Sequence, residues 1–366
     1  METDENCVTI INHSSKKRSF PVATVPDTNR HIFKQTNTKK RVVLGELTNS
    51  GSVCSIQSFD SRSYLKQANN ECLREDCVRS DVSVSSQSVQ YNRFLYAPLV
   101  YQHLHSLEIE ERRRPLPNYM EKIQKDVTAG MREILVDWLV EVAEEYKLVS
   151  DTLFLTVSYI DRFLSSRHLS KNKLQLLGVS SMLLASKFEE VSPPHVEDYC
   201  YITDNTYTKD EVIQMEKDLL NFLELEQSNP TPKTFLRIFI RALQGDNMPS
   251  CSTFEFLSWF LVELSLLDYS CIRFLPSMVA ASVIFVARFT IQPEKHPWGL
   301  KMQHYSGYKP CELKDCVFAI HDLQLGRKAS FSQAIREKYS QQKFKSVAAL
   351  PSPSDIPVSY FEDVDG

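Results

Sequence analysis

The residues of this chain that usually carry enzyme chemistry are not arranged for catalysis. His103 and His105 lie two positions apart in a helical stretch, so their side chains diverge and cannot share a metal ion. Glu189 and Glu190 end a helical pattern just before Pro193, where solvated carboxylates are the simplest interpretation. The sequence has no phosphate-binding glycine motif and no kinase catalytic motif, and it contains only 9 glycines. We therefore expect no catalytic residue, no metal site and no cofactor, and predict that this protein is not an enzyme.

The stretch with the most unusual side chains is residues 131–146, MREILVDWLVEVAEEY. It has no Gly or Pro, and Thr128 precedes it as a candidate N-cap, so a helix is predicted. On a helical wheel one narrow sector is acidic and holds Glu133, Asp137, Glu141 and Glu144. A core stripe consists of Leu135, Val136, Leu139 and Ala143, and a further apolar group at its edge consists of Met131, Ile134 and Trp138. The pattern fits either a fully buried helix or a helix with a second apolar face that binds a partner.

Arg132 falls inside the apolar sector of this helix. A guanidinium at such a position needs a carboxylate, because an unpaired buried charge is strongly unfavourable. Asp161, in the next predicted helix, is the candidate partner for a buried ion pair. The alternative is an arginine that extends along its own stem to solvent.

The chain contains an internal duplication with a period of 101 residues. A shift of this length superposes four apolar blocks without gaps; for example, Ile134, Leu135, Trp138 and Leu139 fall on Phe235, Leu236, Phe239 and Ile240. Each copy predicts five helices, over roughly 128–146, 151–166, 172–188, 195–201 and 208–223, and then 232–244, 252–268, 275–290, 297–305 and 309–325. Arg132 has a counterpart in Lys233, but Asp161 falls on Val262. We therefore expect the first copy to be the recognition module.

Composition separates a tail from a folded body. Of the 366 residues, the first 90 are rich in Ser, Asn and Thr, lack Trp, and carry 12 Lys and Arg against 10 Asp and Glu. The remainder carries 30 against 36, so an acidic body argues against nucleic-acid binding. The N-terminus lacks the apolar segment of a signal peptide, and no apolar run is long enough to span a membrane. The nine scattered cysteines favour reduced thiols in an intracellular protein.

The blocks MREILVDWLVEV, YIDRFLS and LLASKFEE together resemble the cyclin box of an A-type (mitotic) cyclin, and the resemblance extends from about residue 91 to about residue 339. Some details of the tail and of the C-terminal SYFEDVDG look plant-like. The resemblance implies an all-α fold of two tandem five-helix bundles, with an N-terminal helix and a disordered N-terminal tail. The expected domains are a tail at 1–90, an N-terminal helix and linker at 91–126, cyclin boxes at 127–227 and 228–327, and a C-terminal tail at 328–366.

The resemblance also implies partners and their contact residues. The function would be activation of a cyclin-dependent Ser/Thr kinase between S phase and mitosis, with kinase contacts at Lys187, Phe188, Glu216 and Leu225. A docking patch for Arg-x-Leu motifs of substrates and inhibitors would contain Met131, Ile134, Leu135, Trp138, Glu141 and Gln175. A destruction box read by a ubiquitin ligase of the anaphase-promoting type would use Arg41, Leu44 and Asn49.

Basic clusters in the tail bear on the location of the protein. The clusters at residues 16–18 and 39–41 are possible nuclear-import signals, and we therefore expect the protein in the nucleus and also in the cytoplasm. The alternative is that they have no such role, because short basic runs are common in flexible tails.

Two alternative functions remain. A general transcription factor of the same duplicated fold is one alternative, but it would need a basic body. A transcription-type cyclin is the other, but it would not need a destruction box.

Overall fold

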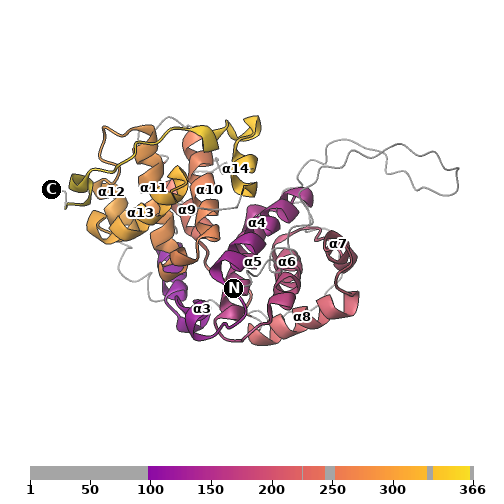
Figure 1. The fold of residues 1–366 in the computed structure, drawn as a ribbon. Helices are drawn as coiled ribbons and strands as arrows, with labels where there is room; N and C mark the ends of the chain where they lie inside the picture. The colour runs from indigo at the N-terminus through magenta and orange to yellow at the C-terminus, as the bar shows by residue number, and fades with distance from the viewer. Residues whose placement is uncertain (1–97, 225, 244–251, 328–332, 363–366) are drawn as a thin grey trace, which may run out of the picture. The chain divides into compact units, whose positions relative to one another are not determined.

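The structure is a computed structural model, and it describes residues 98–224, 226–243, 252–327 and 333–362. All of them belong to one compact unit, residues 86–366. The predicted N-terminal tail, with Arg41, Leu44 and Asn49, lies outside the described residues. The described part is built from helices, without a strand, and contains two successive bundles (Figure 1). No helix in the described ranges is both long enough and apolar enough to cross a membrane.

The first bundle contains the five helices expected from the sequence. They are α4 (Ala129–Glu145), α5 (Ser150–Leu164), α6 (Leu174–Glu189), α7 (Val196–Ile202) and α8 (Lys209–Phe222). Thr128 is the N-cap of α4, as predicted, and its side chain accepts a hydrogen bond from the amide of Met131. At the start of α8, Thr208 and Glu211 form a capping box. These local signals fix where the helices begin.

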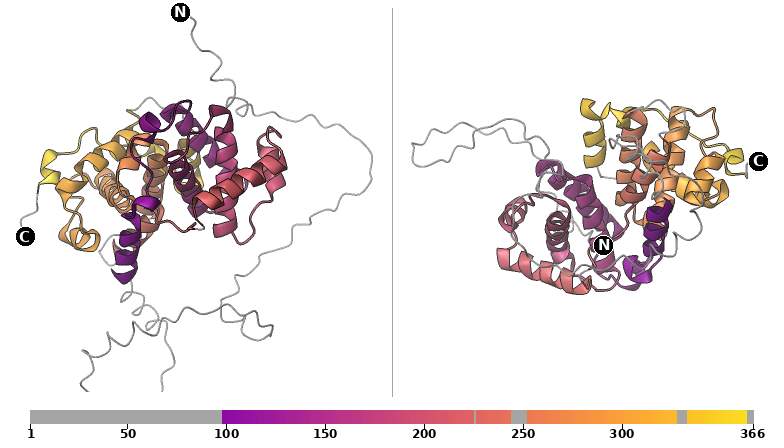
Figure 2. Two further views of the ribbon diagram at one scale, coloured as in Figure 1. Left: turned by 90° about the horizontal axis from the view of Figure 1, so that it is seen from below. Right: turned by 180° about the vertical axis from the view of Figure 1, so that it is seen from behind.

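The second bundle repeats the five-helix order of the first. Its helices are α9 (Pro232–Leu243), α10 (Ser252–Leu267), α11 (Pro276–Ile291), α12 (Leu300–Ser306) and α13 (Pro310–Leu325). The largest departure from prediction is α12, which begins three residues later than expected. Trp298 is fully buried just before it, and its indole Nε1 donates to the carbonyl of Tyr308 at 2.9 Å. Because Trp298 is held in this way, residues 297–299 form a loop instead of the first turn of the helix. Figure 2 shows the two groups of helices from two further sides.

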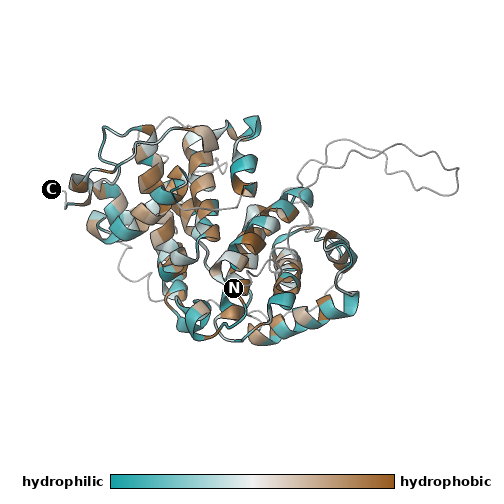
Figure 3. Cartoon of the chain, viewed as in Figure 1, coloured by the Kyte–Doolittle hydropathy of each residue, from teal (hydrophilic) through white to brown (hydrophobic). Residues whose placement is uncertain are grey.

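The third helix is the centre of the first bundle. Helix α6 packs against α4, α5, α7 and α8. Gly178 allows the close approach of α4, because a Cβ at this position would lie 2.8 Å from Leu135 Cδ1. In the second bundle α11 packs against α9, α10 and α13. Figure 3 shows α10 and α11 as mostly hydrophobic ribbons, whereas α8, at the edge of the first bundle, is mainly hydrophilic.

The segment before the first bundle packs mainly on the second. A helix over residues 98–108 places Tyr101 against Phe235 and Phe239. At its end the buried Glu108 accepts a hydrogen bond from the backbone amide of Ser277, at the start of α11. A carboxylate at this position complements the positive end of the α11 dipole. The chain then continues through η2 (Glu111–Arg113) and α3 (Tyr119–Lys122) into α4.

The C-terminal segment is packed more extensively than the sequence indicated. It forms α14 (Ala334–Tyr339) and the short 3-10 helices η5 (Gln342–Phe344), η6 (Val347–Ala349) and η7 (Val358–Phe361). Helix α14 contacts both α4 and α10, so it bridges the two bundles. Near the end, Phe361 is buried and stacks on Phe285 with ring centroids 5.2 Å apart. Aromatic burial therefore fixes the end of the predicted C-terminal tail to the second bundle.

Candidate partner-binding site

A buried ion pair lies behind the candidate binding surface of α4. Arg132 Nε and Nη2 donate to the two carboxylate oxygens of Asp161 at 2.6 and 2.7 Å, and both residues are buried. Tyr119 OH donates to the same carboxylate at 2.8 Å. Burial alone would lower the pKa of Arg132, but the Asp161 carboxylate raises it, so the guanidinium stays charged. The buried ion pair predicted from the sequence is therefore confirmed.

The ion pair also joins the two bundles, which the sequence did not indicate. Arg132 Nη1 donates to the carbonyls of Leu266 and Leu267 at 2.8 and 3.2 Å. These carbonyls belong to the last turn of α10, where the helix itself provides no partners. One side chain of the first bundle therefore completes a helix end of the second.

The equivalent position in the second bundle has a different environment. The Nζ of Lys233 lies 4.3 Å from the centre of the Trp259 ring, and burial lowers its pKa to about 8. Glu263, next to Val262, accepts hydrogen bonds from Lys338 and from Tyr339 OH. The second bundle therefore uses its buried carboxylate to hold the C-terminal segment.

The predicted docking patch is only partly accessible. Ile134 is 37% exposed, Met131 and Gln175 are half-buried, and Glu141 is exposed. Trp138 is 9% exposed and Leu135 only 1%. Leu135 packs against Gly178 in the core, and Trp138, predicted at the edge of the apolar stripe, is almost fully buried, so neither adds much accessible surface in the free chain. Their part in the docking patch stays a prediction.

The acidic sector of α4 is not simply a solvated face. Asp137 accepts hydrogen bonds from the backbone amides of Gln333 and Ala334, both at 3.1 Å, and so caps α14. Glu144 pairs with Lys338 and Lys343, each at 3.2 Å. These contacts were missed because nothing in the local sequence links an α4 carboxylate to residues about 200 positions later. The visible signal was the excess of acids on a single face.

The two predicted charged contact residues, Lys187 at the end of α6 and Glu216 on α8, face each other. Lys187 Nζ lies 2.6 and 2.8 Å from the two carboxylate oxygens of Glu216. The Lys187 side chain is 49% exposed and that of Glu216 is 9% exposed. Because half of the lysine side chain contacts solvent, a partner can reach this pair without unfolding either helix.

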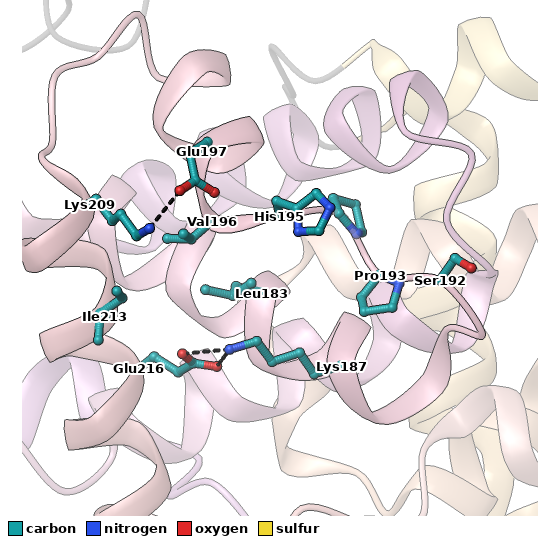
Figure 4. A pocket seen from close by; sticks show the side chains of 11 residues that line it. Leu183, Lys187, Ser192, Pro193, His195, Val196, Glu197, Lys209, Ile213 and Glu216 are labelled. Atoms are coloured by element: carbon teal, nitrogen blue, oxygen red, sulfur yellow. Dashed lines mark hydrogen bonds and ion pairs between the residues drawn. The ribbon is translucent and has the colours of Figure 1, made fainter. Parts of the chain in front are cut away.

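The pair lies at the edge of a groove of about 830 Å³ between α6, α7 and α8 (Figure 4). Across the groove, Lys209 and Glu197 form a second ion pair at 2.6 Å. The floor and walls include Leu183, Ile213, Val196 and the loop 192–195. The groove therefore presents apolar surface between two sets of opposite charges.

Exposed apolar side chains follow directly after Lys187. Phe188 is 47% exposed and Val191 is fully exposed. Val191 was not among the predicted contacts, although its place in a polar turn before two prolines was a visible signal. Leu225, the fourth predicted contact, lies outside the described residues. The described ranges hold no group of three or more His, Cys, Asp or Glu side chains suited to a metal ion.

The geometry and two family models agree on what this fold is. Residues 100–227 match the model described as "Cyclin, N-terminal domain", and residues 230–353 match "Cyclin, C-terminal domain". Putative cyclin-A3-1 of Arabidopsis thaliana is 49% identical over 361 residues, which cover 99% of this chain and 98% of that protein. The chain belongs to the cyclin family.

Further comparisons place this cyclin among the plant A-type cyclins. Cyclin-A3-1 of Oryza sativa subsp. japonica is 60% identical over 270 residues, 74% of this chain and 72% of that protein. A viral cyclin from herpesvirus saimiri, known from its crystal structure, shares the fold with a TM-score of 0.53 and 23% identity. That match covers 61% of this chain and 96% of the viral chain. Cyclins are regulatory subunits rather than enzymes, in agreement with the expected lack of catalytic motifs.

Proposed function

We propose that this cyclin activates a cyclin-dependent Ser/Thr kinase by holding one of the kinase's helices in its active position. The observation that carries the proposal is the accessible Lys187–Glu216 pair beside the exposed ring of Phe188. A lysine can donate to the terminal carbonyls of a partner helix, and a glutamate can accept from amides or hydroxyls. When the kinase binds, its groups take part in this pair and its apolar residues cover Phe188 and Val191.

Activation would follow from positioning alone. In protein kinases a helix carries the glutamate that pairs with the ATP-binding lysine, and displacement of that helix disrupts the active site. A rigid surface that binds only the active position shifts the kinase toward it by differential affinity. Helices α6 and α8 are suitable for this role because they pack directly on each other.

We further propose that α4 binds substrates at a separate place. The accessible part of the docking patch comprises Ile134, Met131, Gln175 and Glu141, while Trp138 is 9% exposed. An aliphatic residue of an Arg-x-Leu motif would cover Ile134, and its arginine would pair with Glu141. Burial, Asp137 and Glu337 raise the pKa of Glu141, which is consistent with local negative charge that favours a cation.

The remaining proposals concern regulation. We infer that the cyclin acts between S phase and mitosis in the nucleus, and also in the cytoplasm, and that it is removed by an anaphase-promoting ubiquitin ligase. Support comes from the sequence: the basic clusters at 16–18 and 39–41, and a destruction box at Arg41, Leu44 and Asn49 ahead of the cyclin box. Replacement of Arg41 and Leu44 by Ala should prolong the life of the protein at mitotic exit in a degradation assay.

The decisive experiment reverses the charges of the Lys187–Glu216 pair. Histone phosphorylation would be measured with a panel of purified cyclin-dependent kinases and wild-type cyclin, Lys187→Glu, Glu216→Lys, and both changes together. The double variant keeps an internal ion pair but presents the opposite polarity. We expect all three variants to lose most of the activation. The matched control reverses Lys209 and Glu197, across the same groove, and should retain activity.

Two outcomes would contradict the proposal. Full activation by the double variant would mean that the pair only stabilises the cyclin itself. Absence of activation by the wild type across the panel would exclude the kinase partner. The docking patch is tested separately with Ile134→Glu, which should slow phosphorylation of an Arg-x-Leu protein substrate but not of a short peptide. Leu300→Glu, at an exposed leucine of the second bundle, is its control.

A further inference from the structure

Arg162 is a buried arginine for which the described part of the chain provides no acceptor. It lies on α5, is 5% exposed, and its Nε and Nη1 have no hydrogen-bond partner. Arg132 is equally buried, but each of its nitrogens has an acceptor. Arginine does not lose its proton in proteins, so the charge of Arg162 persists, and Tyr159 and Glu226 act on it only electrostatically. Its Nε and Nη1 can therefore each donate to an acceptor from outside the described residues.

The short helix η2, which carries two further arginines, lies over the face of α5 that carries Ser158. Ser158 is one helical turn before Arg162, and its hydroxyl accepts from Asn229 Nδ2 at 2.9 Å. Asn229 Nδ2 also lies 3.3 Å from the carbonyl of Arg113, which places η2 over this face. Burial, Arg113 and Arg112 lower the pKa of Arg162 while Tyr159 and Glu226 raise it, so the three guanidinium groups share one electrostatic environment. We call Arg112, Arg113 and Arg162 the arginine cluster.

The carboxylates near the arginine cluster pair with two of its three members. Glu226 accepts from Arg112 Nη1 at 2.7 Å and lies 3.3 Å from Arg113 Nη2. Glu110 pairs with Nε of the same two arginines, at 2.9 and 3.0 Å. Neither carboxylate makes a hydrogen bond to Arg162 within the described residues. Glu224 also acts on Arg112 electrostatically, so three carboxylates surround the three arginines, but Arg162, the most buried of the arginines, is the one without a hydrogen-bonded carboxylate.

We propose that the arginine cluster binds a phosphorylated serine or threonine side chain of a partner protein, and that Glu226 takes the place of the phosphate in the free chain. If Glu226 moves out, Nη1 of Arg112 and Nη2 of Arg113 lose this acceptor and Arg162 still has none, and a phosphate dianion offers three acceptor oxygens where a carboxylate offers two. Planar guanidinium groups also bind phosphate oxygens in pairs. Arg112 is 59% exposed, so the phosphate has a path of entry.

The surroundings favour a protein segment over a free ion. Ile109 and Leu116, on either side of η2, are 55% and 45% exposed. The backbone amide of Leu116 donates to Ser165 Oγ, which fixes this leucine near the end of α5 that carries Arg162. Apolar side chains that flank a phosphorylated residue of a partner protein would cover Ile109 and Leu116. This site is separate from Lys187 and does not depend on kinase activation.

The test uses the full-length cyclin and a fluorescent peptide with one phosphoserine between leucines. Its unphosphorylated form, a glutamate form and inorganic phosphate are the comparison probes. Fluorescence anisotropy should show binding of the phosphopeptide that is roughly tenfold tighter than binding of either other peptide. Glu226→Gln removes the internal competitor and should tighten binding several-fold, whereas Arg112→Ala should weaken it about tenfold.

Arg162→Met and a matched control separate a binding site from a structural role. Methionine fills the same space without charge, so this variant should lose phosphopeptide binding while its melting temperature stays equal or rises. Arg327→Ala, an exposed ion-paired arginine of the second bundle, should bind normally, as should Lys187→Glu. The proposal is overturned if neither wild type nor Glu226→Gln binds the phosphopeptide, if Arg327→Ala weakens binding as much as Arg112→Ala, or if inorganic phosphate binds as tightly as the peptide.

Discussion

Removal of the charge of Asp161 should destabilise this cyclin more than most single substitutions. In Asp161→Asn the amide can accept only one of the two hydrogen bonds that Arg132 donates at 2.6 and 2.7 Å, and it presents a donor to the other nitrogen. Arg132, 1% exposed, would then hold an uncompensated buried charge. We expect a loss of about 3–5 kcal/mol in the free energy of unfolding.

A double-mutant cycle separates the ion pair from its surroundings. Arg132→Met alone should cost about the same, because the Asp161 carboxylate is left buried with only Tyr119 as a partner. Arg132→Met with Asp161→Asn removes both charges and should cost at least about 2 kcal/mol less than the sum of the two single substitutions. It should remain about 1–3 kcal/mol below wild type, because the Leu266 and Leu267 carbonyls lose their hydrogen bonds.

The assay is urea unfolding followed by far-ultraviolet circular dichroism and by tryptophan fluorescence. Coincident transitions in wild type justify a two-state treatment. Because Arg132 connects the two bundles, the two probes should diverge in Arg132→Met. The reasoning fails if Asp161→Asn costs less than about 1 kcal/mol. It also fails if the cost of the double variant equals the sum of the two single costs to within about 0.5 kcal/mol.

Three further predictions test other contacts. Gly178→Ala should cost about 1–3 kcal/mol in urea unfolding, because the new Cβ would lie 2.8 Å from Leu135 Cδ1; an unchanged midpoint would contradict this close packing. Burial lowers the folded-state pKa of Lys233 to about 8, so between pH 8 and 10.5 the unfolded chain binds more protons than the folded chain. The free energy of unfolding should therefore rise by up to about 3 kcal/mol across this range, relative to Lys233→Met. Parallel pH curves for the two proteins would refute the burial of the charge. Asp137→Ala should leave the first amides of α14 without their acceptor and speed proteolysis after residue 333, whereas Glu145→Ala, at an exposed acid on the last turn of α4, should not.

The helices and their order were predictable from the sequence. Apolar residues recur with the period of a helix, and signals such as Thr128 and Pro310 mark where helices begin. The 101-residue repeat predicted two bundles of five helices, because equivalent blocks of one chain fold alike. The partnership of Arg132 with Asp161 was predictable as well, since a buried guanidinium has few possible neighbours on the next helix.

The limits of prediction appear on the two sides of α4. A helical wheel separates an apolar from a polar sector, but it does not say which of two apolar faces meets another helix. The structure buries Leu135 and most of Trp138 and leaves Ile134 at the surface. The wheel likewise shows an acidic sector without revealing that Asp137 caps a helix 196 positions later.

The sequence by itself thus determined the helical periodicity, the helix starts, the duplication and the family. Only the tertiary structure decided which faces pair, how the C-terminal segment bridges α4 and α10, and that Arg162 is buried without an acceptor. The physical reason is the distance along the chain over which each effect acts. Propensity and capping act within a few residues, whereas burial and hydrogen bonding of a side chain depend on whichever distant segment packs over it.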